Sequence, residues 1–418
     1  MPTLSASNRT QARYKLEGQY PTNFGVPQTG NGTNIAMTGE TFNYDIKTEQ
    51  SKVLRSDRGI ASHVQVGATA GGALNIEHIY REYDPFYAAI LGSAWVAYGT
   101  NGVTGTAIGT LTPTATTLTA GSAPTGNDAF TNLWKGQWFS IIPAAGATQA
   151  VKDYCKSRAF KVHKTTAPTS TVITVDPATP IDTTILSGAL SGAKISTSRL
   201  VTGTDMWSYT IEMAHEDISR YRIYTGQIPG KLNLKLSVGA IVTGSIEFMG
   251  KAQLPLATSS TMGTPVASQT YVSANATRGV FDILEGGSSV TATTYIKSAD
   301  ITLDGSLRMQ DAVGVFGSAG IAPGTFKLGG TLEVYFADSV VYNKFVNGTA
   351  TSLEVPILDV DGNGYIYVFP NFRYTSGKVN AAGLDQDNTL SLTFECDIDS
   401  DPTSATYQKM MAIYRVGA

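Results

Sequence analysis

The sequence is poor in charge, and this shortage excludes several classes of protein. Asp, Glu, Lys and Arg make up 15% of the 418 residues, against about 25% in a typical soluble protein. The net charge of −3 argues against a nucleic-acid-binding protein, which carries a basic stripe. No apolar run is long enough to cross a membrane. A hydrophobic content of 42% is too high for a disordered chain.

Cysteine and histidine are also scarce. Cys155 and Cys396 lie far apart in the sequence, so we expect free thiols and assembly in a reducing compartment. The four histidines show no metal-ligand spacing. Phosphate loops, dinucleotide fingerprints and nucleophile elbows are absent. We therefore expect no catalytic residue, no metal and no cofactor. Only paired carboxylates from distant strands would leave room for an enzyme.

Glycine, threonine and serine are abundant instead. The 43 glycines and the short alternating apolar runs predict an all-β protein. The low charge then has two explanations. Either the surface is polar and neutral, or copies of the same chain cover much of it, because interface cores are depleted in charged residues.

Four short segments of the first half recur in the same order in the second half. The four pairs are GGALNI (71–76) with GGTLEV (329–334), the aromatic and acidic 83–90 with 337–345, RIYTG (222–226) with RYTSG (373–377), and TGSIEF (243–248) with TLSLTFE (389–395). One such pair would be coincidence. Four pairs in one order predict a duplicated β-rich unit, which is a device for building symmetric assemblies.

This repeat predicts the domain organisation. We expect two related β-sandwich or barrel units, each with a short flanking helix, and a small inserted β-domain whose aromatic centre contains Trp134 and Trp138. The helices are expected at 83–91, with Asp84 as N-cap and Gly92 closing it, and at 338–346. The expected division is an N-terminal arm (1–32), a first unit (33–104 and 205–295), the insertion (105–204) and a second unit (296–418).

Two acidic segments suggest cation binding, but both have simpler explanations. Residues 359–364 (DVDGNG) match the start of an EF-hand loop, yet Pro370 stands where the bidentate Glu should be. Strand-like sequence flanks the segment, so we favour a glycine-rich hairpin turn. Asp397, Asp399 and Asp401 alternate, and we favour a solvated strand end.

The charged residues are concentrated in one short segment and along one polar face. The segment 52–58 is either an exposed hairpin with local ion pairs or a tongue that contacts a neighbouring subunit. Its candidate contact residues are Lys52, Arg55, Ser56, Asp57 and Arg58. The polar face of the repeated strands carries no basic side chain at its candidate lumen or interface positions, which are Asn75, Glu77, Glu247, Glu333 and Glu395.

An ordered set of short motifs resembles the major tail tube proteins of long-tailed, non-contractile bacteriophages. In the first half the motifs are NFGVP (23–27), ETFNY (40–44), RSDR (55–58), VGA (66–68) and the alternating Gly72, Leu74 and Ile76. In the second half they are GIA (320–322), GTLEVYF (330–336), FVNGT (345–349) and FRYTSG (372–377). The matches span most of the chain outside the insertion.

The resemblance implies a structural virion protein that assembles in the bacterial cytoplasm. Such proteins form stacked rings of six-fold or pseudo-six-fold symmetry around the tape measure protein, contact terminator and distal tail proteins, and later pass DNA without binding it. A long loop between early strands contacts the next ring. Here 52–58 would be that loop, and 304–324 its counterpart in the second half. Two units per chain favour a trimer over a hexamer.

The physical chemistry of DNA passage agrees with this family. Each phosphate that Lys or Arg neutralises adds affinity through counterion release, so a conduit needs a neutral or acidic wall. The main alternative is a carbohydrate-binding, adhesive β-protein in which Trp134 and Trp138 form a stacking platform on the insertion.

Overall fold

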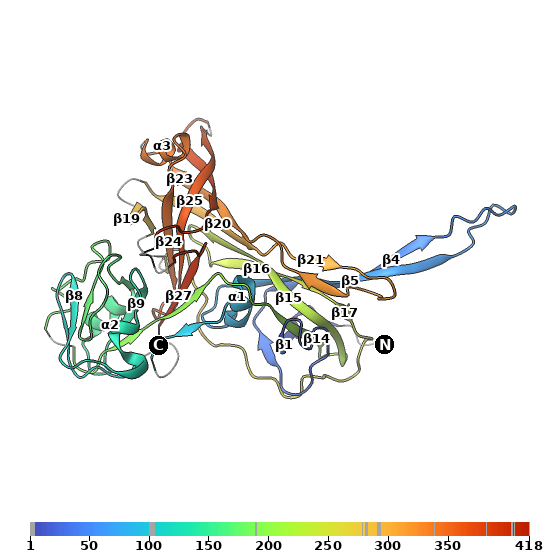
Figure 1. The fold of residues 1–418 in the computed structure, drawn as a ribbon, viewed down its shortest axis with the longest axis horizontal. Helices are drawn as coiled ribbons and strands as arrows, with labels where there is room; N and C mark the ends of the chain where they lie inside the picture. Colours follow the sequence, from blue (N-terminus) through green and yellow to red (C-terminus); the bar gives the residue numbers. More distant parts are fainter. Residues whose placement is uncertain are drawn as a thin grey trace.

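Most of the chain is organised around one long antiparallel sheet (Figure 1). The computed structural model describes residues 5–99, 105–188, 190–277, 279–280, 283–290, 294–337, 339–381, 383–402, 404 and 406–417. The eight strands of this sheet, in the order in which they pair, are β4 (Asn43–Gln50), β5 (His63–Glu77), β16 (Thr243–Gly250), β15 (Arg220–Ser237), β20 (Ile296–Asp304), β23 (Lys327–Tyr335), β26 (Thr389–Cys396) and β25 (Gly364–Asn380).

Strand β3 (Gly39–Glu40) continues the ladder of β4 along β5. Further strands fold back beneath the two ends of the long sheet. At the first end they are β1 (Thr10–Gln19), β2 (Thr33–Ile35), β14 (Trp207–His215) and β17 (Ala252–Gln253). At the second end they are β6 (Val96–Ala97), β13 (Ser198–Val201), β18 (Leu284–Glu285), β19 (Ser288–Ser289), β24 (Thr351–Leu358) and β27 (Ala412–Val416). Because β15 and β25 are long, each continues from the long sheet into the layer that covers it.

One face of the long sheet is buried in a single apolar core. Leu74, Leu232, Ile301, Leu332 and Leu392 come from five strands of the sheet and all belong to this core. They alternate along their strands with polar residues, as the period of two requires for a sheet that is covered on one side only. Burial of each such side chain stabilises the fold by about 1.5–3 kcal/mol.

The two halves of the chain pair their strands in the same register. Gly72 lies opposite Phe248 in the first half, and Gly330 lies opposite Phe394 in the second. Each long strand also has a bulge at the matching place, at Gly230 on β15 and at Thr375 on β25. The fold therefore consists of two related β units with an insertion, as the sequence predicts.

The repeated Gly-Gly pair has the same packing role in both units. A Cβ atom on Gly71 would lie 2.5 Å from the carbonyl oxygen of Phe248. A Cβ atom on Gly329 would lie 2.5 Å from the carbonyl oxygen of Phe394. Neighbouring backbones approach too closely at these positions for any side chain, so only glycine fits.

One of the four predicted echoes is wrong. The register places Arg373 beside Glu395 in β26, as Ile228 is placed beside Met249 in β16. Arg373 therefore corresponds to Ile228 and not to Arg222, six residues earlier. The fourth echo is confirmed, because Thr243 and Thr389 occupy matching ladder positions. Short Thr- and Gly-rich strands resemble one another by composition alone, and this explains the false match.

Both predicted helices form, with small differences at their ends. The helices of the fold are α1 (Asp84–Leu91), α2 (Gln149–Lys156) and α3 (Val340–Val346). Asp84 is the first helical residue and not the N-cap, because its carboxylate accepts hydrogen bonds from Tyr365 and Arg415. Gly92 ends α1 with φ +69°, as predicted. Asp338, expected to begin the second helix, lies outside the described residues. Within the described part of the chain, no helix is long and apolar enough to span a membrane.

The prediction of an N-terminal arm over 1–32 is wrong for the described residues of that segment, which begin at Ser5. Strand β1 pairs with β14 along its whole length and with β2 on its other edge. Ala12 is fully buried in the core, and Arg13 is almost fully buried beside acidic partners. The segment is polar, and its sequence alone therefore did not indicate a strand. A buried ion pair between Arg13 and Glu212 helps to hold this strand in the sheet.

The insertion is a compact β-domain with a core of its own. Its strands form two small sheets, one of β7 (Leu111–Pro113), β8 (Thr117–Ala120) and β11 (Val172–Thr174), the other of β9 (Trp138–Ile142), β10 (Phe160–Lys161) and β12 (Lys194–Ser196). It lies at the far end of the molecule from the β4–β5 hairpin (Figure 1). Trp138 is buried in a separate cluster that includes residues of β25 and β27, so it packs where the insertion meets the second unit.

Candidate assembly surfaces

The β4–β5 hairpin projects far from the body of the protein (Figure 1). Its strands pair from Asn43 opposite Gly71 to Gln50 opposite His63, and the tip connects residues 50 and 63. Leu54 at the tip is 98% exposed, and Val53 and Ile60 are also largely exposed. An exposed apolar tip on a projecting hairpin is typical of a surface that contacts another molecule.

All of the predicted contact residues lie at this tip and are exposed. The Arg55 guanidinium donates two hydrogen bonds to the Asp57 carboxylate, at 2.9 and 2.6 Å. These bonds and one from the Gly59 amide lower the pKa of Asp57 to about 2. Lys52 and Arg58 form no ion pair with any residue that the structure describes, and Ser56 lies between Arg55 and Asp57 in the turn.

The second unit carries a smaller hairpin at the matching place. Its strands are β21 (Arg308–Gln310) and β22 (Gly320–Ala322). It follows Asp304, which lies opposite Lys327 just as Asp45 lies opposite Thr69 in the first unit. The segment 304–324 and the β4–β5 hairpin are thus structural counterparts.

The polar candidates share the uncovered face of the long sheet. Asn75 lies opposite Ser245, and Glu77 lies opposite Thr243, with Glu247 one row away on the same face. In the second unit, Glu333 lies opposite Ser391 and Glu395 opposite Gly329.

The candidate positions themselves carry no basic side chain, but their neighbours on this face do, so the face is not the neutral-to-acidic wall that was expected. Lys231 lies between Glu247, at 3.2 Å, and Asp304, its partner across the strand pair. Other basic residues in the same rows lie beside carboxylates too: Lys235 opposite Asp300, Lys327 opposite Asp304, and Arg373 opposite Glu395. The repeated segments do not reveal these residues, because Lys231 and Lys235 lie on β15, outside the repeated segments that define the polar face. The face is of mixed and nearly balanced charge.

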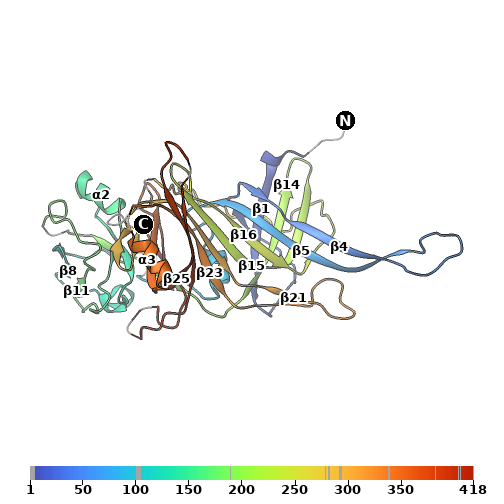
Figure 2. The same ribbon diagram turned by 90° about the horizontal axis from the view of Figure 1, so that it is seen from above.

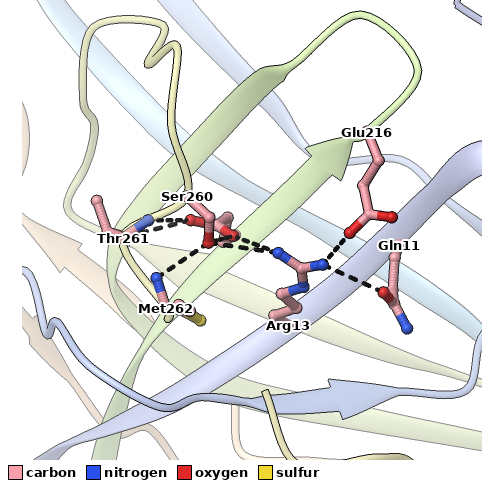
Figure 3. Close-up of polar contacts among 7 residues, drawn as sticks. Gln11, Arg13, Glu216, Ser260, Thr261 and Met262 are labelled. Carbon is pink, nitrogen blue, oxygen red and sulfur yellow. Dashed lines mark hydrogen bonds and ion pairs between the residues drawn. The ribbon is translucent and has the colours of Figure 1, made fainter. Parts of the chain in front are cut away.

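A buried carboxylate holds strand β1 in the first unit, and Figure 3 shows Arg13, the residue of β1 that pairs with it. Glu212 on β14 is fully buried and forms an ion pair with Arg13 at 3.2 Å. It also accepts hydrogen bonds from the hydroxyl groups of Ser260 and Thr261. The other terminal nitrogen of the Arg13 guanidinium pairs with Glu216, and the guanidinium also donates to Ser260 (Figure 3). One side chain thus links the N-terminal strand to β14, to Glu216 just after it, and to the 260–262 loop.

A second buried carboxylate occupies the matching position in the second unit. Glu354 on β24 lies opposite Val368 just before a bulge, as Glu212 lies opposite Ile223. Its partners come from the insertion, because Lys161 approaches to 2.6 Å and the Trp138 indole donates a bond of 2.6 Å. The insertion is thus fastened to the second unit at the site where β1 is fastened to the first. A Glu within the apolar runs 207–215 and 351–358 was the only sequence signal for these sites.

The acidic segments that resemble cation sites are closed by their own backbone. The Asp359 carboxylate accepts hydrogen bonds from the amides of Asp361 and Asn363, at 2.8 and 2.9 Å, in the turn between β24 and β25. This is the predicted hairpin turn. Asp399 is buried and accepts bonds from Thr406 and the Asp401 amide, so the strand end is not simply solvated. Among the residues that the structure describes, no cluster could hold a metal ion.

The two tryptophans form neither the predicted aromatic centre of the insertion nor the stacking platform of the carbohydrate-binding alternative. Trp138 is fully buried, and only Trp134 is exposed, with the Arg199 guanidinium 4.3 Å from the centre of its ring. One exposed ring that already stacks on an arginine gives little support to the carbohydrate-binding alternative.

Comparison with known families identifies the type of protein. The sequence matches the family model of the phage tail tube protein over residues 7–396. The chain belongs to the phage tail tube protein family. Membership makes it a structural component of the virion tail and implies oligomeric assembly into a tube with other tail proteins. No curated protein matches the sequence significantly.

Proposed function

We propose that this tail tube protein assembles by itself into closed rings that stack into a tube, and that the tube conducts DNA into the bacterial host. One observation carries the proposal beyond family membership: two units of the same register lie side by side in one continuous sheet. A sheet built by repeating a unit sideways can be continued by further copies until it closes. With two units per chain, three chains supply six units, so we favour a trimeric ring with pseudo-six-fold symmetry.

The polar face of the long sheet is proposed to line the bore. Its lysines stand beside carboxylates, as Lys231 does between Glu247 and Asp304. Each phosphate that approaches such a lysine also meets a carboxylate, so little counterion release is gained. A wall of alternating charge therefore lets DNA pass without tight binding, and a wholly acidic wall would do the same.

The remaining parts are assigned by position. We propose that the two tube units are 33–104 with 205–295 and 296–418, extended by β1 at the N-terminus, and that the insertion 105–204 lies outside the tube. Strands β6, β13, β18 and β19 fall within the first and inserted ranges but complete the second unit, because they pair with β27 and β24 or with one another. The β4–β5 hairpin is proposed to reach the next ring. We further propose that the tube surrounds the tape measure protein and contacts the terminator and distal tail proteins. Assembly is proposed to take place in the host cytoplasm.

Electron microscopy of the purified protein tests the proposal. We expect rings or tubes by negative stain, and averaged end views show whether the ring contains three chains or six. Leu54→Asp at the hairpin tip should leave the chain folded and prevent stacking, because a charge replaces a fully exposed apolar contact. Leu256→Asp, at a 55% exposed leucine away from the hairpin, is the matched control and should still stack. A monomer with no tendency to form rings would refute the proposal.

A further inference from the structure

The two units of one chain are joined by a strand pair whose register is fully defined. Strand β15 of the first unit pairs with β20 of the second, with Leu232 opposite Leu303 and Leu234 opposite Ile301. The ladder continues past the bulge, where the Gly305 amide donates a hydrogen bond of 2.8 Å to the Gly230 carbonyl. This is a contact between one unit and the next, made inside a single chain.

Each partner in that contact has a counterpart in the other unit. Ile246 of β16 and Leu392 of β26 occupy the same position in their units. Leu232 of β15 lies opposite Ile246, and Gly377 of β25 lies opposite Leu392, so Leu232 and Gly377 are equivalent residues. Leu303 of β20 lies opposite Leu328, and Tyr44 of β4 lies opposite Ala70. Because Leu328 and Ala70 occupy the same position in their units, Leu303 and Tyr44 are equivalent residues.

The two counterpart edges have no partner within the described chain. Strand β4 pairs with β5 alone, and the last residues of β25, Ser376–Asn380, pair with β26 alone. The two edges lie at opposite ends of the long sheet (Figure 2). Apolar side chains at these edges are exposed, with Val379 at 40% and Ile46 at 39%, whereas the corresponding Leu234 of β15 is buried. Open strand edges of this kind are ready to accept another strand.

We propose that β25 of one copy pairs with β4 of a second copy, antiparallel and in the register of β15 with β20. The inference rests on the ring proposed above and names the edges that close it. In this register Gly377 lies opposite Tyr44 of the second copy, Lys378 opposite Asn43, and Ser376 opposite Asp45. Each contact joins two different edges, so copies add in one direction around the ring until the last meets the first.

The side chains at the proposed interface complement one another. Gly377 packs against α3, where a Cβ atom would lie 2.7 Å from the Phe345 ring, so this position offers backbone and no side chain to a neighbouring strand. Tyr44 supplies the bulk from the other strand, where the internal contact has two leucines. Lys378 gains Asp45 as a diagonal neighbour, an attractive cross-strand pair.

The backbone ladder begins at Tyr44. The Phe42 amide already donates to the Glu40 carboxylate at 2.6 Å, and the Phe42 carbonyl accepts bonds from Arg222 and Tyr224. The free backbone groups are those of Tyr44 and Ile46, which face away from β5. Pairing therefore runs from Gly377 with Tyr44 to the bulge, where the Ile46 amide meets the Thr375 carbonyl as Gly305 meets Gly230.

Disulfide cross-linking of the full-length protein tests the register. In the proposed ladder Asn43 and Lys378 form a non-hydrogen-bonded pair, with Cα atoms about 4.5 Å apart, a distance that a disulfide can bridge. Both residues are exposed, and within one chain they lie on the two opposite edge strands of the long sheet. Only two different copies can therefore bring them together. The double variant N43C/K378C should therefore form disulfides between chains on mild oxidation. The native Cys155 and Cys396 are buried, and burial raises their pKa values, so they react slowly.

Controls distinguish the register from random collision. The K47C/K378C variant moves one cysteine four residues along β4, about 13 Å away, and should cross-link poorly. In a closed ring of three, the covalent species of N43C/K378C should stop at three chains, whereas a hexamer would continue to six. Rings or tubes in the microscope without the N43C/K378C cross-link would overturn the proposed pairing and leave the proposed function standing. Absence of rings in the wild-type protein would overturn the proposed function itself.

Discussion

Two lysine–carboxylate pairs join the insertion to the second unit, and they differ in burial. Lys161 and Glu354 are 2.6 Å apart with side chains 10% and 4% exposed. Lys156 and Asp361 are 2.9 Å apart with side chains 45% and 58% exposed. The comparison between them isolates the effect of burial on an otherwise similar contact.

Lys161→Ala should destabilise the protein strongly and Lys156→Ala should not. Removal of Lys161 leaves the Glu354 charge buried with only the Trp138 indole to compensate it, and breaking a buried pair costs about 3–5 kcal/mol. The exposed pair is worth at most about 1 kcal/mol. Urea unfolding followed by tryptophan fluorescence measures both, because Trp138 lies at the affected contact.

A double variant separates the lost attraction from the cost of the orphaned charge. Lys161→Met with Glu354→Gln removes both charges, keeps the volume and keeps an acceptor for the Trp138 indole, so it should recover much of the stability lost in Lys161→Ala. Equal effects of Lys161→Ala and Lys156→Ala would refute the reasoning. So would a double variant as unstable as the single one, since the cost would then lie in packing and not in the unpaired carboxylate.

Two further predictions concern stability. Gly72→Ala should destabilise the fold by about 1–3 kcal/mol, because the new Cβ would lie 2.4 Å from the Phe42 Cα, whereas Gly67→Ala on the same strand meets no atom within 4 Å and should be neutral by thermal unfolding. Burial lowers the pKa of His78, which bonds to Tyr367, from 6.5 to about 4. The unfolded chain binds the proton first, so stability should fall as pH drops from about 6.5 to 4, by about 3 kcal/mol in total. His78→Gln should lose that part of the slope in urea titrations across this range, and an unchanged slope would contradict the assignment.

The sequence predicted what depends on local pattern. Alternating runs gave the strands of both units, and Gly92 gave the end of α1. The Gly-Gly pairs at 71–72 and 329–330 marked the duplication correctly, because close backbone approach tolerates no other residue. The hairpin 52–58 was found because charge is rare elsewhere in the chain.

What the sequence did not predict depends on contacts between distant segments. Strand β1 looked like a free arm, since the residue that fixes it, Arg13, finds Glu212 about 200 positions later. The lysines of β15 were missed on the polar face because nothing local shows that β15 lies next to β16 and β20. Register across strands is set by the whole sheet, and one sequence contains it only implicitly.

The duplication also explains why the chain can contain a model of its own assembly. Where two copies of a unit are fused, the contact between them is built once inside the chain, by β15 and β20, and in the proposed ring the same contact is repeated between chains. The internal contact carries opposite charges, with Lys231 facing Asp304 and Lys235 facing Asp300. The corresponding positions on β25 and β4 hold Ser376 and Asp45, and Asn380 and Thr41, so neither ion pair is retained. A contact that forms within one chain has no competing partner, whereas the proposed contact between chains would have to form only with the correct edge. Fewer fixed charges and the Phe42 amide that is already bonded to Glu40 would weaken the proposed edges and so limit pairing with a wrong strand.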